Sequence, residues 1–374
     1  MCSATGGSDV GKMTNDEGGV LCTLRWARGA RHDGVPPFMS EIRQNRLTGE
    51  SVVIAPERAK RGTNLARAAA PAAAVPAYDA ACPFCAGNES TTGPETYRAC
   101  GEDGQWAVRS CVNKYSVLSP EGEVGQVDGT EHGHGHGAVN GVGLHEVVVE
   151  SPRHDLSMAA LPAAQVRRIG DAYVARFRAF YADPRVRHVI IFKNHGAEAG
   201  ASQQHPHSQI VGIPIMPGQV VERVAHARQF FAASGRCLAC SMIAEEQAEG
   251  SRVVAENAAY IAFIPYAALS PYHLWIFPKA HAACFSEVPR DTEGALAELL
   301  HTVLEKIFGL LGNPPFNLVV RSLGPREKDA AYFHWYLAIV PRVNRVAGFE
   351  LGTGMYINPM LPEAAAAALR EYRA

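Results

Sequence analysis

The feature that most constrains this chain is an internal duplication marked by cysteine and histidine. Each half contains a Cys-x-x-Cys pair, then a histidine at the end of an apolar stretch, and then a second histidine. The two histidines are 51 positions apart in the first half and 53 in the second. A repeat on this scale indicates two related structural units in one chain. The residues are Cys82, Cys85, His154 and His205, followed by Cys237, Cys240, His281 and His334.

Each half also repeats an order of secondary-structure elements. Apolar residues at helical spacing predict helices over 163–182 and near 292–311. Apolar runs predict strands at 187–194 and 316–322, each between the two histidines of its half. We therefore predict an α+β fold of two duplicated units, each an antiparallel sheet with a helix packed against it.

The composition of the 374 residues indicates the boundaries of the two halves and argues against binding to nucleic acid or a membrane. Residues 1–38 are rich in glycine and lack the apolar core of a secretory signal, so we expect a disordered leader. The first half then covers 39–217 and the second 218–374. The formal net charge of −2 gives no electrostatic footprint for nucleic acid, and no apolar stretch is long enough to span a membrane. With nine cysteines and no secretion signal, we expect reduced thiols or metal ligands in a cytoplasmic protein.

The two ligand sets predict a metal site in each half. Two thiolates and two imidazoles form a tetrahedral set that zinc favours, and four protein ligands close such a site to substrate. We therefore expect two structural zinc ions. The alternative is that the thiols are ordinary buried side chains and the histidines belong to the core. His132, His134 and His136 lie in a glycine-rich stretch, 121–143, without a rigid scaffold, so we interpret them as a solvated insertion.

Comparison of the halves separates the candidate chemistry from the metal ligands. Aligned on the second histidine of each half, Tyr336 stands where the first half has His207, and Ala338 where it has Gln209. Alternate positions of a strand share one face, so His207 and Gln209 are expected to point the same way. The alternative is a surface strand whose polar residues have no role. Because metal binding does not explain His207, only the first half is predicted to be reactive.

His207 has the properties of a nucleophile. A neutral imidazole, with an unperturbed pKa of about 6.5, is nucleophilic near neutral pH. A rigid strand would orient it for in-line attack on phosphorus. Gln209 can donate its amide N–H to a phosphate oxygen where charge develops. Asn194, Gly200 and Ser202 come to the same end of the sheet, where small residues let backbone N–H groups approach phosphates.

These motifs resemble those of a known family. The segment HPHSQ (205–209), preceded by FKNHGAEAGAS, is similar to the signature of the transferase branch of the histidine-triad superfamily, the galactose-1-phosphate uridylyltransferase family. The segments NRLTGESVVIAPERAKR, CPFC, SPRH, PKAH and GFELGTGMYINP agree with it, over roughly residues 40–372. Within the family, the resemblance is strongest to the plant-type ADP-glucose phosphorylases.

The resemblance implies histidine-triad-like units and a ping-pong transfer of a nucleotidyl group. His207 would attack the α-phosphorus of a nucleotide-sugar and carry the nucleotidyl group until phosphate or a hexose 1-phosphate accepts it. The resemblance also implies zinc at the ligand sets and a homodimer with its active sites near the subunit interface. By family position, the substrate-binding residues are Arg58, Arg61, Asn113, Asn194, Gly200, Ser202, Gly348, Phe349 and Glu350.

Roles within that set also follow from the resemblance. Gln209, Ser202 and Asn194 would contact phosphates, and Asn113 lies near the segment that contacts the nucleoside. The two arginines would serve the phosphate-bearing substrates; a solvated charge run is the alternative for them. Uridylyltransferases of the family carry a lysine shortly before the segment that aligns with Gly348–Glu350. This chain has no lysine there, which favours phosphate as the acceptor.

Alternative functions stay open at this point. A uridylyltransferase of galactose metabolism remains possible if Arg345 replaces the missing lysine. A nucleotide hydrolase of the same superfamily would have a third histidine at the position of Gln209, and glutamine cannot shuttle a proton. A zinc-dependent nucleotide-binding module without activity would not need His207 and Gln209 together in one half.

Overall fold

The structure, a computed structural model, describes residues 40–61, 75–127 and 138–373. The predicted leader 1–38 and the histidines at 132, 134 and 136 lie outside these ranges. Of the residues described, those from Ser40 onward belong to one compact unit. Among them, no helix is both long and apolar enough to cross a membrane.

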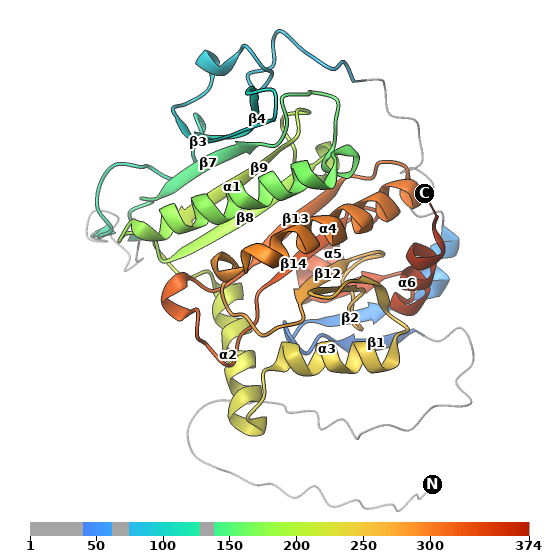
Figure 1. Ribbon diagram of the computed structural model, residues 1–374. Coiled ribbons are helices and arrows are strands. Elements are labelled where there is room, and N and C mark those ends of the chain that lie inside the picture. Colours follow the sequence, from blue (N-terminus) through green and yellow to red (C-terminus); the bar gives the residue numbers. More distant parts are fainter. Residues whose placement is uncertain (1–39, 62–74, 128–137, 374) are drawn as a thin grey trace, which may run out of the picture. The chain divides into compact units, whose positions relative to one another are not determined.

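Ten strands of the described chain form one antiparallel sheet, which runs through both halves (Figure 1). The two halves meet in the middle of the sheet, where β8 pairs with β13. Outward from there, each half contributes five strands, and the strand that follows the second histidine of the half is the second of the five in both. The repeat predicted from sequence is therefore a structural duplication. The first half supplies β8 (His188–His195), β9 (His207–Ile213), β7 (Leu144–Val149), β4 (Trp106–Val112) and β3 (Glu95–Cys100). The second supplies β13 (Phe316–Arg321), β14 (Tyr336–Pro341), β12 (Leu274–Pro278), β11 (Tyr260–Phe263) and β10 (Val253–Glu256).

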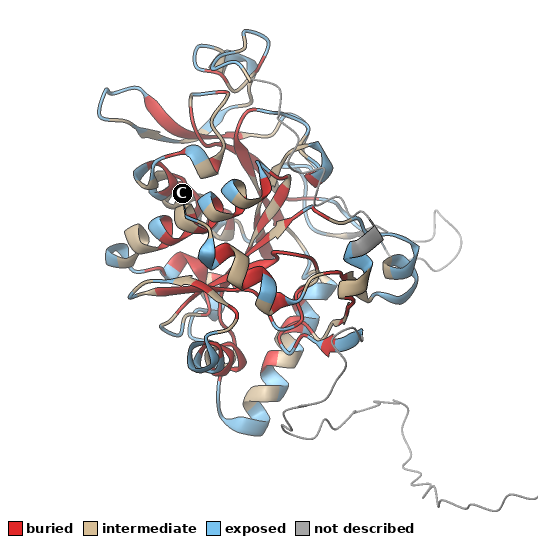
Figure 2. Cartoon of the chain, turned by 90° about the vertical axis from the view of Figure 1, so that its right-hand side faces the viewer, coloured by how far each residue is buried: buried red, intermediate tan, exposed pale blue. Residues whose placement is uncertain are grey.

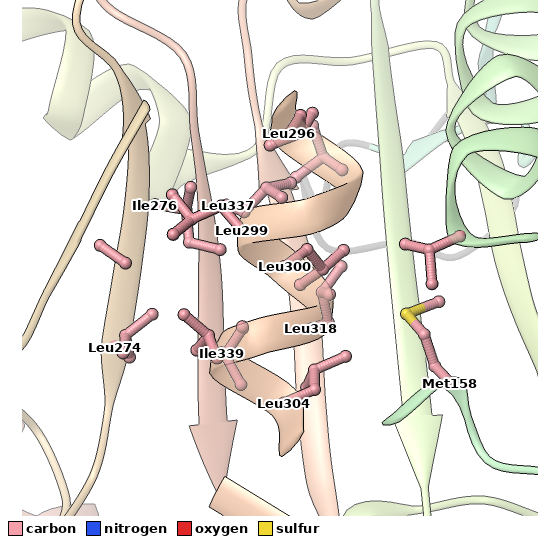
Figure 3. Packing of buried hydrophobic residues seen from close by; sticks show 14 of the residues in the cluster. Met158, Leu274, Ile276, Leu296, Leu299, Leu300, Leu304, Leu318, Leu337 and Ile339 are labelled. Atoms are coloured by element: carbon pink, nitrogen blue, oxygen red, sulfur yellow. The ribbon is translucent and has the colours of Figure 1, made fainter. Parts of the chain in front are cut away.

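Two long helices, α1 (Ala163–Ala182) and α4 (Arg290–Leu311), lie side by side over one face of this sheet (Figure 1). They confirm the helices predicted from the spacing of apolar residues. Figure 3 shows the leucines of α4 packed over the strand residues Leu318, Leu337 and Ile339, all buried. Because this face is filled by apolar packing, polar chemistry is left to the opposite face.

The opposite face is covered differently in the two halves. In the second half, α3 (Leu238–Glu249) packs its apolar residues over β11, β12 and β14. The helix before it, α2 (Gly218–Ser234), is followed by Gly235, whose φ of 67° is a left-handed conformation that favours glycine. In the first half, the corresponding face remains open around His207. Figure 2 shows burial concentrated in the strands and exposure on the outer sides of the helices.

A small sheet joins the beginning and the end of the described chain. β1 (Glu41–Gln44) pairs antiparallel with β2 (Ser51–Ile54), and β2 pairs in parallel with β15 (Tyr356–Asn358). The helices α5 (Gly348–Thr353) and α6 (Pro362–Glu371) flank β15 in sequence. The small sheet contains strands from before and after residue 217. The predicted boundary between the two halves at residue 217 therefore stays a prediction. Two further strands, β5 (Gln126–Val127) and β6 (Ala138–Val139), pair antiparallel in a separate two-stranded sheet.

Candidate active site and metal centres

The first ligand set converges as predicted. The ligand atoms of Cys82, Cys85, His154 and His205 all lie within 4.8 Å of one another, and all four residues are buried. The Nδ1 atom of His205 is 3.7 Å from each of the two Sγ atoms, and Nδ1 of His154 is 3.5 Å from Sγ of Cys85. Zn–S and Zn–N bonds of about 2.3 and 2.0 Å would give tetrahedral edges of about 3.5 Å. The residues present therefore fit a tetrahedral metal ion.

A backbone contact orients the His205 imidazole for this role. Its Nε2–H donates to the carbonyl oxygen of Ser151 at 2.8 Å, which turns Nδ1 toward the thiols. Burial lowers the pKa of His205 to about 4, so the ring is in the neutral, metal-binding form at neutral pH. Such outer contacts are typical of metal-ligating histidines.

The second ligand set converges in the same way. Sγ of Cys240 is 3.4 Å from Nδ1 of His281 and 3.4 Å from Nδ1 of His334. Nε2–H of His334 donates to the carbonyl of Pro278 at 3.0 Å. All four ligand atoms, including Sγ of Cys237, again lie within 4.8 Å of one another. His281 is exposed, so this centre is more open to solvent than the first.

His207 is the first residue of β9 and faces a pocket of about 400 Å³. Its Nδ1–H donates to the backbone carbonyl of His205 at 2.8 Å, and burial lowers the pKa of His207 below its usual range. Hence the ring is neutral at neutral pH, and Nε2 carries the free electron pair. The pocket is lined by Phe84, Thr92, Cys111, Asn113, Tyr115, Val117, His145, Ser202, Gln203, His207 and Gln209, among others.

A buried ion pair that the sequence did not reveal supports the strand at His207. Nζ of Lys193 donates to Oε2 of Glu150 at 2.7 Å and to the carbonyl of His207 at 3.1 Å. The other carboxylate oxygen accepts the hydroxyl of Ser208, which lies 2.5 Å from the hydroxyl of Tyr173. These contacts tie β7, β8 and β9 together at the level of His207. Their only signal in the sequence is one charged residue directly after the apolar strand β7 and one within β8.

The predicted phosphate-contacting residues lie around this strand end. Gln209 and Ser202 line the pocket together with Asn113. Asn194 lies beside His207, because β8 and β9 pair with Phe192 opposite Gln209. Its Nδ2 donates to the carbonyl of Gly200 at 3.5 Å, and Gly200 has a φ of 88°.

Of the other predicted substrate-binding residues, Arg58 and Gly348–Glu350 are not among the described residues that line this pocket. Arg58 is exposed on the short 3-10 helix Pro56–Arg61, and the side chain of Arg61 is outside the described part. Gly348 and Phe349 begin α5, where the Glu350 carboxylate accepts the N–H of Ala347 at 2.9 Å. Their contacts with substrate stay predictions.

In the second half, the position of the pocket is filled. Tyr336, the counterpart of His207, is 2% exposed. Its ring stacks on Phe277 with centroids 4.9 Å apart and packs against Trp275 at 5.2 Å. Aromatic packing beneath α3 thus leaves no room for a substrate there, as the comparison of the halves predicted.

Comparisons with known proteins agree with this geometry. A family model described as galactose-1-phosphate uridyl transferase, N-terminal domain, matches residues 36–217, and a model described as a domain of unknown function matches 172–371. ADP-glucose phosphorylase from Arabidopsis thaliana is 34% identical, covering 92% of this chain and 96% of that protein. Galactose-1-phosphate uridylyltransferase from Thermotoga maritima is 27% identical, covering 89% and 98%.

A solved structure of a related protein has a similar fold. The crystal structure of the Arabidopsis thaliana ADP-glucose phosphorylase with bound ADP-glucose superposes with a TM-score of 0.75 at 31% identity, covering 90% of this chain and all of that one. The predicted α+β fold and the predicted nucleotidyltransferase class are confirmed. The chain belongs to the galactose-1-phosphate uridylyltransferase family.

Proposed function

We propose that the protein is an ADP-glucose phosphorylase that converts ADP-glucose and phosphate to glucose 1-phosphate and ADP through a nucleotidyl-His207 intermediate. The observation that carries this proposal is the orientation of His207. Because its Nδ1–H is held by the carbonyl of His205, the electron pair of Nε2 is directed away from the backbone, at a pocket that Gln209 also lines. The similarity to the Arabidopsis thaliana phosphorylase supports ADP-glucose as the substrate.

The chemistry has two balanced steps. In the first, Nε2 of His207 forms a bond to the α-phosphorus, and the bond from that phosphorus to the bridging oxygen breaks, releasing glucose 1-phosphate. In the second, an oxygen of inorganic phosphate attacks the same phosphorus, the N–P bond breaks, and ADP leaves with His207 neutral again. The amide N–H groups of Gln209 stabilise charge on the non-bridging oxygens in both steps.

The same residues argue against the competing functions. Gln209 has no titratable proton, so it cannot act as a general acid to a leaving group or as a general base to an attacking water, which favours transfer over hydrolysis. The segment from Asn344 to Gly348 has no lysine, which favours phosphate over galactose 1-phosphate as acceptor. Uridylyl transfer in galactose metabolism is the second candidate, since relatives with that activity match most of the chain.

We further propose that the active protein is a homodimer. The segment Gly348–Glu350 and Arg58 are not among the residues that line the His207 pocket of their own chain, which supports their supply to substrate by a second subunit. Large apolar side chains near that segment are exposed, including Phe349 at 42% and Leu351 at 80%. Burial of such side chains in a subunit interface would stabilise a dimer.

The metal in both centres is proposed to be zinc with a structural role. Thiolate and imidazole ligands suit zinc, and four protein ligands exclude substrate from the metal. We expect elemental analysis of the intact protein to find about two zinc ions per chain, and about one in Cys237→Ser. Chelation should lower Tm. Less than about one zinc ion per chain in undamaged protein would contradict the assignment.

The substrate assignment is tested by comparing two complete reactions. We expect kcat/KM for ADP-glucose with phosphate to exceed that for UDP-glucose with galactose 1-phosphate by about tenfold or more, a difference of at least about 1.4 kcal/mol in transition-state binding. Crossed mixtures, ADP-glucose with galactose 1-phosphate and UDP-glucose with phosphate, separate the choice of base from the choice of acceptor. A clear preference for the uridylyl exchange would overturn the phosphorylase assignment.

A further inference from the structure

We infer that His145 is a positioning residue: it fixes the side-chain amide of Gln209 so that its nitrogen, and not its oxygen, faces the reacting phosphate. The inference rests on the proposed function, because it assigns a partner to the residue that stabilises the transferred group. His145 lies in β7, on the face of the sheet that carries His207, and lines the same pocket.

The first step is the tautomer of His145. The backbone N–H of Val117 donates to Nδ1 of His145 at 3.2 Å, so Nδ1 has no proton. The ring is buried, and burial lowers the pKa of His145, which keeps it neutral at neutral pH. A neutral imidazole carries one N–H, and here it must be on Nε2.

The second step is the acceptor for that N–H. Two side-chain atoms lie close to Nε2: Oε1 of Gln209 at 2.8 Å and Nδ2 of Asn113 at 3.0 Å. The side-chain oxygen of Asn113 accepts the backbone N–H of Tyr115 at 2.9 Å, and this hydrogen bond would be lost if the amide turned its oxygen toward His145. An amide nitrogen is not an acceptor. Hence Nε2–H of His145 donates to Gln209.

The orientation of Gln209 follows. His145 holds the Oε1 atom of Gln209. The Nε2 atom of Gln209 then donates to no group in the described part of the chain and is free to bind an anion in the pocket. Rotation of the amide by 180° would present a carbonyl oxygen to a phosphate, which is repulsive. His145 therefore selects the one orientation of Gln209 that assists transfer.

The second half of the chain provides a natural control for this reasoning. Val147 lies opposite Gln209 as Trp275 lies opposite Ala338, so His273 holds the position of His145. The backbone N–H of Leu269 lies 3.3 Å from Nδ1 of His273. The indole N–H of Trp275 donates to Nε2 of His273 at 3.0 Å, so this nitrogen is an acceptor and not a donor as in His145. A histidine whose Nε2–H donates to a glutamine thus exists only in the half that contains His207.

Two conservative variants separate these two contacts. Asparagine places an acceptor where Nδ1 was but has no donor at the position of Nε2, and glutamine places an amide donor near the position of Nε2. We expect His145→Asn to lower the single-turnover rate of nucleotidyl transfer from ADP-glucose by about tenfold or more, since loss of a full oxyanion donor costs about 10²–10³. KM for ADP-glucose and Tm should change little. His145→Gln should recover most of the rate.

A double-mutant cycle tests the route through Gln209. In Gln209→Ala, the additional change His145→Asn should cause no further loss of rate, because the group that it positions is gone. His273→Asn is the matched control and should leave the rate of the folded protein unchanged. Equal rates in His145→Asn and the unmodified protein, or additive losses in the cycle, would overturn the inference. Absence of transfer in the unmodified protein would overturn the proposed function instead.

Discussion

Replacing His207 with glycine is expected to abolish nucleotidyl transfer and to leave the fold intact. The variant has no nucleophile, so the covalent intermediate cannot form, and the rate should fall by roughly four to six orders of magnitude. The fold should tolerate the change, since the counterpart of His207 in the repeat is Tyr336 and neither half requires histidine at this strand position. Single-turnover transfer and thermal unfolding check the two parts of the prediction.

His205→Ala is the matched comparison for this variant. It removes a ligand of the first metal centre two residues away, so it should lose metal and melt at a lower temperature. Its activity should fall as a consequence of the lost structure. If His207→Gly still transfers the nucleotidyl group, or melts as early as His205→Ala, the assignment of roles to the two histidines is wrong.

Lys193→Met should be among the most destabilising single substitutions in the chain. Lys193 is 1% exposed and Glu150 fully buried, so the variant leaves a buried carboxylate without its cation. Removal of one partner of a buried ion pair costs about 3–5 kcal/mol in the free energy of unfolding. The same lysine holds the carbonyl of His207, so transfer should slow as well.

The controls for this substitution follow from charge and exposure. The double variant Lys193→Met/Glu150→Gln has no uncompensated charge and should recover a large part of the lost stability. Lys279→Met removes a cation from a partly exposed pair with Glu256, and such pairs contribute only about 0–1 kcal/mol. Denaturant unfolding measures all three variants. A loss in Lys193→Met no larger than that in Lys279→Met would contradict the role of the buried pair.

Much of the fold and of the site was predictable because it depends on spacing along the chain. The helix periodicity over 163–182 coincides with α1, and the strand after His205 coincides with β9. The two ligand sets were predictable because cysteine and histidine recur at matched intervals in both halves. Comparison of the halves then singled out His207 without any structure.

What remained hidden depends on contacts between segments far apart in the sequence. Glu150 directly follows β7 and Lys193 lies within β8, and only the pairing of β7, β9 and β8 brings them together. His145 gave no signal because its role depends on the backbone of Val117 and on Gln209 across the strand. The small sheet was likewise not predictable, because β15 joins β2 across about 300 residues of chain.

The central claim is that His207 carries the nucleotidyl group, and the most direct test is to trap that intermediate. The protein is incubated with ADP-glucose labelled at the α-phosphorus, without phosphate, and the labelled peptide is identified by mass spectrometry under alkaline conditions. We expect about one acid-labile label per active site on His207, released as labelled ADP when phosphate is added. A label on another residue, or turnover of ADP-glucose by His207→Gly at the normal rate, would contradict the account.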